Sequence, residues 1–225
     1  MKFIETIKNI WRIQELRNKL GYTLLFILIY RFGSFIVLPG INADMMQKYL
    51  EQQTSGGLMS LLDMFSGGAF SNASIFALGI MPYISASIVM QLLTIAVPYF
   101  KKMQMEGESG RNKINSWTRY LTVVILLLQA PSYLVNLRMQ IPSSYQGAPI
   151  LPTGTWFTVS STLILCAGSM FVMWLGERMT DRGIGNGISM LIMIGIIARF
   201  PHAFSAEFVS RTGDAVGGLV MMLLE

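Results

Sequence analysis

The sequence has few of the residues on which catalytic and metal chemistry usually depends. It contains one cysteine, Cys166, and one histidine, His202, among 225 residues. A lone cysteine excludes an intramolecular disulfide, and without clustered Cys and His ligands we expect no metal site. We predict that Cys166 packs as an apolar residue inside a membrane span. Charged residues are also scarce, at 13% of the chain against about 25% in soluble domains.

Hydrophobic residues make up 52% of the chain, and they gather in long runs. One stretch without a charge extends from Met64 to Phe100. A continuous helix of that length, at ~1.5 Å per residue, would exceed the ~30 Å hydrocarbon core of a bilayer. Gly67-Gly68 and Ser71-Asn72 also interrupt it. We therefore predict a half-inserted segment, a break and then one full crossing. Irregular backbone at membrane depth is tolerated only inside protein or beside water, which favours a pore or substrate path.

The apolar runs together predict an all-α, polytopic membrane helical bundle with five complete spans, the start of a sixth and a re-entrant segment. Five spans are what one half of an inverted repeat would contain, so we interpret the chain as half of something larger. The predicted segments are a cytoplasmic amphipathic helix at 1–19, span 1 at 20–38, an external loop at 39–58, the re-entrant segment at 59–71, span 2 at 74–98, a cytoplasmic loop at 99–119, span 3 at 120–137, an external loop at 138–155, span 4 at 156–176, a tight cytoplasmic turn at 177–182, span 5 at 183–199, an external loop at 200–214 and the start of span 6 at 215–225.

The positive charges predict the orientation of the chain in the membrane, because cationic loops stay in the cytoplasm. If the 64–100 run crosses once, most of the 17 Lys and Arg residues fall on one side; if it crosses twice, they divide evenly. We therefore predict a single crossing, with the N-terminus and the 101–119 loop in the cytoplasm.

An enzyme and an ion-coupled transporter are both disfavoured by the residues. The chain has no Gly-x-Ser-x-Gly, no paired carboxylates on one helical face and no nucleotide-binding G-x-x-x-x-G-K-[ST] motif. Glu106 and Glu108 lie in a hydrophilic stretch, where we expect them to pair with neighbouring Lys and Arg. Ion-coupled transporters tend to bury charged residues in their spans, yet here Arg31 is the main exception. We predict that Arg31 snorkels or pairs with a carbonyl group. We expect no enzymatic activity and no cofactor.

A passive conduit for something large is the third class. The segment Met59 to Phe70 (MSLLDMFSGGAF) has the composition of a movable stopper, although an ordinary external interfacial helix would look the same. Ile80 and Ile84, and also Ile188 and Ile192, lie one helical turn apart. Such pairs could form an apolar collar that excludes water, while lipid-facing or core packing remains the alternative from the residues alone.

Four blocks of sequence carry a resemblance to a known family. They are RFGSFIVLPGI at 31–41, MFSGGAFSNASIFALGIMPYISASIVMQLL at 64–93, EGESGRNKI at 106–114 and MWLGERMTDRGIGNGIS at 173–189. In these blocks, and in their order across the chain, the sequence resembles the N-terminal half of SecY, the channel-forming subunit of the bacterial Sec protein translocon. The resemblance implies a protein-conducting channel subunit for secretion and membrane insertion of polypeptides.

The resemblance also implies roles for particular residues. The implied pore ring consists of Ile80, Ile84, Ile188 and Ile192. The implied plug, a re-entrant helix, consists of Met59, Ser60, Leu61, Leu62, Asp63, Met64, Phe65, Ser66, Gly67, Gly68, Ala69 and Phe70. The implied lateral gate for signal sequences includes Ser85, Ser87, Met90 and Gln91.

Partners and location follow from the same resemblance. The implied partners are SecE, SecG, the SecA ATPase, the ribosome, signal peptides, translocating polypeptides and membrane lipid, with no nucleic-acid binding of its own apart from contact with a docked ribosome. The implied location is the bacterial inner (plasma) membrane, as a multi-pass protein with a cytoplasmic N-terminus. Two competing interpretations are the repeat half of a small-solute transporter and a membrane scaffold without a conduit. The scaffold predicts that charge is tolerated at the plug and ring positions.

Overall fold

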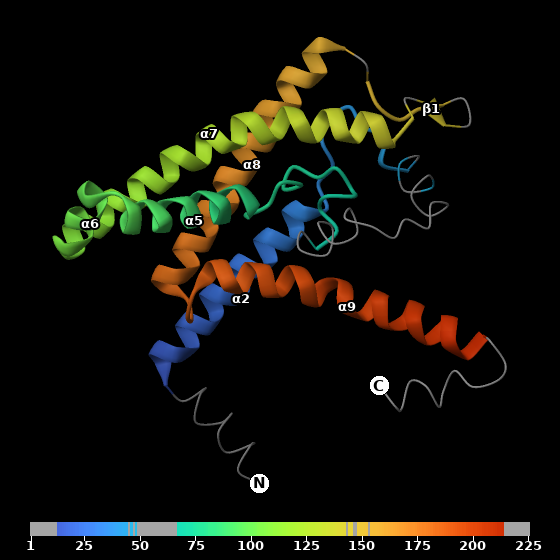
Figure 1. The fold of residues 1–225 in the computed structure, drawn as a ribbon. Helices are drawn as coiled ribbons and strands as arrows, with labels where there is room; N and C mark the ends of the chain where they lie inside the picture. The colour runs from blue at the N-terminus through green and yellow to red at the C-terminus, as the bar shows by residue number, and fades with distance from the viewer. Residues whose placement is uncertain are drawn as a thin grey trace, which may run out of the picture.

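The computed structural model describes residues 13–44, 46, 48, 67–142, 144–145, 148–152 and 154–213. Residues 1–12 of the predicted surface helix at 1–19, most of the re-entrant segment (59–66) and the predicted start of span 6 lie outside these residues. The described elements are α2 (Gln14–Ser34), α5 (Met81–Ala96), α6 (Pro98–Met105), α7 (Glu108–Gln140), β1 (Ser144–Tyr145), β2 (Ala148–Pro149), α8 (Thr155–Arg182) and α9 (Gly187–Gly213) (Figure 1). The prediction of a helical bundle is confirmed, with one addition: β1 and β2 form a two-residue antiparallel ribbon. The end of the predicted surface helix and the predicted span 1 are instead one helix, α2, which ends at Ser34 rather than at residue 38.

Two of the described helices are long and apolar enough to cross a membrane, over Glu108–Met139 and Thr155–Arg182. The pair α5 and α6 would make a third if the two count as one span, but they meet at an angle of 98°. The apolar part of α9, Gly187–Ala198, is shorter. The helix α2 is less apolar, because it carries Arg17 and Lys19 near its start and Arg31 in its last turn. The count of five complete spans therefore stays a prediction.

The start of span 2 needs correction, because α5 begins at Met81 rather than at residue 74. Residues 67–80, which we call the irregular segment, form successive turns. Ala73 and Gly79 have φ angles of +45° and +52°, which a right-handed helix cannot accommodate. Pro82 then lies in the first turn of α5, where its missing N–H costs nothing.

The predicted cytoplasmic loop at 99–119 is helical for most of its length. It holds α6 and the first turns of α7, separated by a reversal at Gly107, whose φ is +79°. The bend before α6 arises at Val97, which is extended because a proline follows it. The polar residues at 99–119 thus indicate where the chain meets water, but they do not indicate where the helices end.

The turn between spans 4 and 5 also lies later than predicted. The helix α8 continues through 177–182 to Arg182, and the turn comprises residues 183–186. Asn186 caps α9, since its side-chain oxygen accepts hydrogen bonds from the N–H groups of Ile188 (3.0 Å) and Ser189 (3.3 Å). Beyond residue 199 the chain remains helical to Gly213, so the predicted external loop at 200–214 is helical up to that residue.

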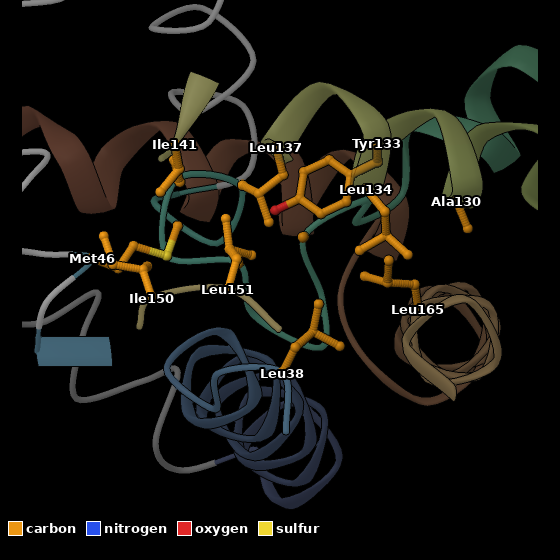
Figure 2. Close-up of a cluster of buried hydrophobic side chains, with 12 residues drawn as sticks. Leu38, Met46, Ala130, Tyr133, Leu134, Leu137, Ile141, Ile150, Leu151 and Leu165 are labelled. Atoms are coloured by element: carbon orange, nitrogen blue, oxygen red, sulfur yellow. The ribbon is translucent and has the colours of Figure 1, made fainter. Parts of the chain in front are cut away.

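The helices pack as follows: α5 lies along α7, α7 packs against α8, and α8 packs against both α9 and α2, which is distant in the sequence (Figure 1). One buried cluster, the α7 cluster, lies where α7 meets the irregular segment and the β ribbon. Figure 2 shows Tyr133, Leu134 and Leu137 projecting from α7 toward Leu151 and Leu38. Cys166 packs against this cluster, as predicted. A second cluster, the α8–α9 cluster, is centred on Val172, Leu175 and Leu191.

The irregular segment is attached to the chain just after α2. The N–H of Leu38 donates to the carbonyl of Ala73, and the N–H of Ile75 donates to the carbonyl of Ile36, both at 2.9 Å. These bonds flank an antiparallel bridge between Val37 and Ser74. They satisfy polar backbone groups that a non-helical segment in a membrane protein would otherwise leave unpaired.

One glycine fixes how closely α8 approaches the irregular segment. A Cβ atom at Gly168 would overlap the carbonyl oxygen of Ile75 and lie 3.3 Å from Cδ1 of Phe76. The absence of a side chain at Gly168 therefore lets the backbone of α8 pack directly against the backbone at Ile75.

Candidate functional site

The irregular segment, α5, α7 and α9 surround an open cavity of about 560 Å³, which we call the central cavity. Its wall is formed by Tyr30 of α2, Phe70, the turn at 77–80, the start of α5, one face of α7 and part of α9. Most of the lining is apolar, while Gln129, Ser132 and Asn136 of α7 add polar groups. Because the lining residues come from five separate parts of the chain, only the fold brings them together.

The predicted ring residues meet at this cavity. Ile80, Ile84 and Ile192 line it, and all four isoleucines belong to or pack against the α8–α9 cluster. The N–H of Ile84 donates to the carbonyl of Ile80 at 3.1 Å, so these residues are one helical turn apart even though Ile80 precedes α5. Ile188 lies close to Ile80, because a Cβ atom on Gly176 would be 3.2 Å from Ile188 Cγ1 and 3.5 Å from Ile80 Cδ1. Their role as a pore ring stays a prediction.

Of the predicted plug, the structure describes Gly67 to Phe70, and Met59 to Ser66 lie outside the described residues. The carbonyl of Gly67 accepts a hydrogen bond from Arg31 Nη1 at 3.1 Å. The carbonyl of Phe70 accepts one from the Tyr133 hydroxyl at 2.8 Å. The Phe70 and Tyr133 rings also meet edge to face, with centroids 4.8 Å apart. Each end of this short stretch is therefore held by a side chain from a neighbouring helix.

The contact made by Arg31 confirms that it pairs with a backbone carbonyl. Its guanidinium carbon also lies 5.2 Å from the centroid of the Phe35 ring, within the range of a cation–π contact. A carbonyl dipole and an aromatic face are favourable neighbours for a charge near an apolar environment.

The four predicted gate residues do not share one face of α5. Ser87, Met90 and Gln91 line a pocket of about 240 Å³ that also includes Arg111 and Thr118 of α7. Ser85 instead lines the central cavity, and its hydroxyl donates to the carbonyl of Met81 at 3.2 Å. Two residues of separation place side chains about 200° apart around a helix, so Ser85 and Ser87 must diverge. The structure brings three of the four together, and the gate assignment itself stays a prediction.

Sequence reasoning missed Tyr133, which is 5% exposed and connects α7 to the irregular segment. A tyrosine within an apolar run was a usable signal, because a buried hydroxyl generally has a hydrogen-bond partner. It also missed the two-pronged ion pair between Arg119 of α7 and Glu177 of α8, with N–O distances of 3.0 and 2.8 Å. Glu106 does pair with Lys113 at 3.4 Å, as expected.

Within the described ranges, no three His, Cys, Asp or Glu residues are grouped to hold a metal.

The fold and the cavity define a class: a helical membrane protein with non-helical backbone beside an apolar internal space. The SecY family model matches residues 74–224. The chain belongs to the SecY family, which confirms the resemblance carried by the four sequence blocks and the prediction that it is not an enzyme.

Several curated relatives carry the name protein translocase subunit SecY. That of Aquifex aeolicus is 42% identical over 223 residues, which cover 98% of this chain and 51% of the relative. That of Pseudomonas aeruginosa is 48% identical over 204 residues, covering 90% and 44%. That of Escherichia coli K12 is 46% identical over 213 residues, covering 93% and 46%. The chain spans about half the length of the curated relatives it matches.

Two solved structures share the fold. One, described as the structure of a protein conducting channel, has a TM-score of 0.57 and 19% identity, covering 88% of this chain and 38% of the other. The second, Sec61 in the canine ribosome-channel complex from the endoplasmic reticulum, has a TM-score of 0.58 and 18% identity, with the same coverage. At these identities the likeness concerns the fold alone.

Proposed function

We propose that this chain supplies half of the wall of a protein-conducting channel for secretion and membrane insertion of polypeptides. The observation that carries the proposal is the meeting of Ile80, Ile84 and Ile192 at one apolar cavity, with Phe70 on its wall. Membership of the SecY family supports it. In this proposal Ile188 completes the contribution of this half to the pore ring.

The proposed mechanism is physical rather than covalent. A narrow apolar constriction resists hydration, so it restrains ions while it is empty. Apolar contacts are non-directional, so branched isoleucine side chains can surround a moving polypeptide without binding one sequence tightly. The energy for movement would come from the SecA ATPase or from translation.

The proposal assigns the plug to Met59–Phe70 and the lateral gate to Ser85, Ser87, Met90 and Gln91 of α5. A signal helix would enter beside Ser85, Ser87, Met90 and Gln91, displace the plug and leave toward lipid. The described end of the plug supports this arrangement, because Phe70 lines the same cavity as the isoleucines.

Partners and location belong to the same proposal. SecE and SecG would assemble with the complete protein, and SecA or the ribosome would dock on its cytoplasmic side. The α6–α7 region carries Lys101, Lys102, Arg111 and Lys113 and would provide secondary contacts there. The chain would lie in the bacterial inner membrane with its N-terminus in the cytoplasm. That one structure of similar fold is described in a ribosome-channel complex is consistent with ribosome docking.

The test is disulfide trapping of a stalled secretory substrate in the full-length protein. The probe cysteine replaces Ile84 in a Cys166→Ser background, and a second cysteine is placed in the substrate. A matched control places the cysteine at Leu128, which lies on α7 and is 70% exposed. We expect crosslinking at Ile84 that requires a functional signal sequence, and none at Leu128.

The alternatives give different patterns in this experiment. Crosslinking elsewhere on the protein but not at Ile84 would move the path away from the isoleucines. No crosslinking at any tested position would favour the small-solute transporter.

A further inference from the structure

We propose that Arg31 and Tyr133 are positioning residues that form a two-point clamp on residues 67–70 and set where this stretch lies against the central cavity. Arg31 holds the carbonyl of Gly67, and Tyr133 holds the carbonyl of Phe70. The clamp rests on the proposed function in one respect: it keeps the channel closed only if the central cavity is the path of the polypeptide.

The first contact uses a charged donor that has no carboxylate partner among the described ion pairs. Those pairs join Lys19 to Glu15, Lys113 to Glu106 and Arg119 to Glu177. The guanidinium of Arg31 is instead placed between the Gly67 carbonyl and the Phe35 ring. Hydrogen bonds from an ionised donor are stronger than neutral ones, so this contact is suited to fixing a backbone position.

The geometry at Gly67 leaves no room for a side chain between α2 and α9. A Cβ atom there would lie 2.9 Å from Arg31 Nη1 and 3.1 Å from both Cα and O of Gly195. Gly67 and Gly68 also have φ angles of +64° and +93°, a region that favours glycine. Gly67 therefore occupies a narrow slot, with the clamp residue on one side and the backbone of α9 on the other.

The second contact fixes the other end of the stretch. The Tyr133 hydroxyl reaches the Phe70 carbonyl at 2.8 Å, and Figure 2 shows its ring directed from α7 into the α7 cluster. Because Tyr133 is buried, losing this bond would leave a phenol hydroxyl without its partner in an apolar setting, which is costly. The edge-to-face contact with the Phe70 ring holds the same residue through its side chain.

The two contacts have a joint consequence for motion. Residues 67–70 belong to no helix, so turn hydrogen bonds from Asn72, Ala73 and Ser74 and the two clamp contacts fix their position, rather than a continuous ladder of helical bonds. Breaking both releases the stretch from α2 and α7, whereas breaking one leaves it attached at the other end. The adjacent glycines at 67 and 68 allow the backbone to rotate once the first contact is lost.

The test measures thiol accessibility in the full-length protein, and it needs no translocating substrate. The reporter is Ala69→Cys in the Cys166→Ser background, since Ala69 lies between the two anchors and is 0% exposed. A membrane-impermeant maleimide is added from the external side. We expect the labelling rate to rise about tenfold with Arg31→Gln and about fivefold with Tyr133→Phe, as expected for loss of a charged and a neutral hydrogen bond.

Three controls separate the clamp from general loosening. Arg17→Gln removes an exposed arginine of the same helix, and Tyr120→Phe removes a hydroxyl from an exposed tyrosine of α7. Neither should change the labelling of Ala69→Cys. A second reporter, Ala130→Cys, is equally buried but belongs to α7 rather than to residues 67–70, and its labelling should stay constant in every variant.

The proposal is overturned if Ala69→Cys labels at the same rate with and without Arg31 and Tyr133. It is also overturned if Ala69→Cys and Ala130→Cys accelerate together, because the two residues would then support the packing of the whole bundle. Failure of the stalled substrate to crosslink at Ile84 would remove the proposed conduit without changing the labelling result, so the two failures are distinguishable.

Discussion

Replacing Gly168 by alanine should destabilise the protein, although alanine is the better helix former. The residue lies within α8, where an added Cβ would overlap the carbonyl oxygen of Ile75. That carbonyl cannot move aside freely, because the N–H of Phe76 in the same peptide unit donates to the Ser74 hydroxyl at 3.2 Å, and the N–H of Ile75 donates to the carbonyl of Ile36 at 2.9 Å. Either α8 or the irregular segment has to shift.

Two opposing terms decide the magnitude. A Gly→Ala change inside a helix gains about 1 kcal/mol of helix propensity. Overpacking a filled site typically costs about 1–3 kcal/mol, and backbone obstruction favours the upper end of that range. We therefore expect a net loss of about 1–2 kcal/mol in the free energy of unfolding.

The matched control is Gly21→Ala, which lies inside α2 and whose Cβ would meet nothing within 4 Å. Both variants gain the same propensity term, so their difference isolates the overpacking cost. Thermal unfolding of the purified full-length protein in detergent, followed by loss of the monodisperse peak after heating, ranks the two. Equal stability of the two variants would refute the reasoning, since it would mean that the Ile75 carbonyl yields without cost.

Three further predictions concern the ring, a helix cap and an ion pair. Ile84→Asp combined with Ile188→Asp should raise ion conductance of the full-length protein in planar bilayers, because carboxylates hydrate an apolar collar; unchanged conductance would count against the ring. Asn186→Ala should cost about 1 kcal/mol of stability by removing the α9 cap, and Asn186→Asp should not; equal melting of both variants would contradict the capping role. A double-mutant cycle on Arg119 and Glu177 should give a coupling of about 1 kcal/mol or less that weakens with salt, because Arg119 is half exposed. A salt-independent coupling would show that the pair is shielded from solvent.

The long helices were predictable because an apolar run of about 20 residues has few structural solutions. The predicted spans at 120–137 and 156–176 lie within α7 and α8. Their ends were not predictable from hydropathy, since Glu177 to Arg182 contains good helix formers and simply continues α8 beyond the apolar stretch. Hydropathy locates the boundary with water, whereas capping and backbone strain locate the end of a helix.

The candidate site was predictable to the extent that it depends on local spacing. The pairs Ile80 with Ile84 and Ile188 with Ile192 follow from the helical repeat, but the meeting of the two pairs requires the packing of α5, α8 and α9. The gate residues came from the family resemblance, and they do not share a face because Ser85 and Ser87 are two positions apart on a helix, about 200° around its axis.

The contacts of the clamp were the least visible in the sequence. Arg31 and Tyr133 both donate hydrogen bonds to main-chain oxygens. Any residue type can provide such an acceptor, so the sequence does not reveal which residue accepts the bond. The sequence could identify Arg31 as a charge that needs a partner, but it could not indicate which carbonyl would provide it.

Every amino acid carries a main-chain carbonyl oxygen. Because the clamp binds these oxygens, it places little demand on the side chains of the residues that it holds. A substitution at Phe70 would leave both acceptors in place, although it would change the ring contact with Tyr133. Gly67 and Gly68 are restricted through their backbone angles, and the slot around Gly67 and the burial of Ala69 limit side-chain size there. The donors Arg31 and Tyr133 have no comparable freedom. Mutational tolerance should therefore be distributed unevenly: within the held stretch Phe70 should vary most freely, while the two residues that hold the stretch stay fixed.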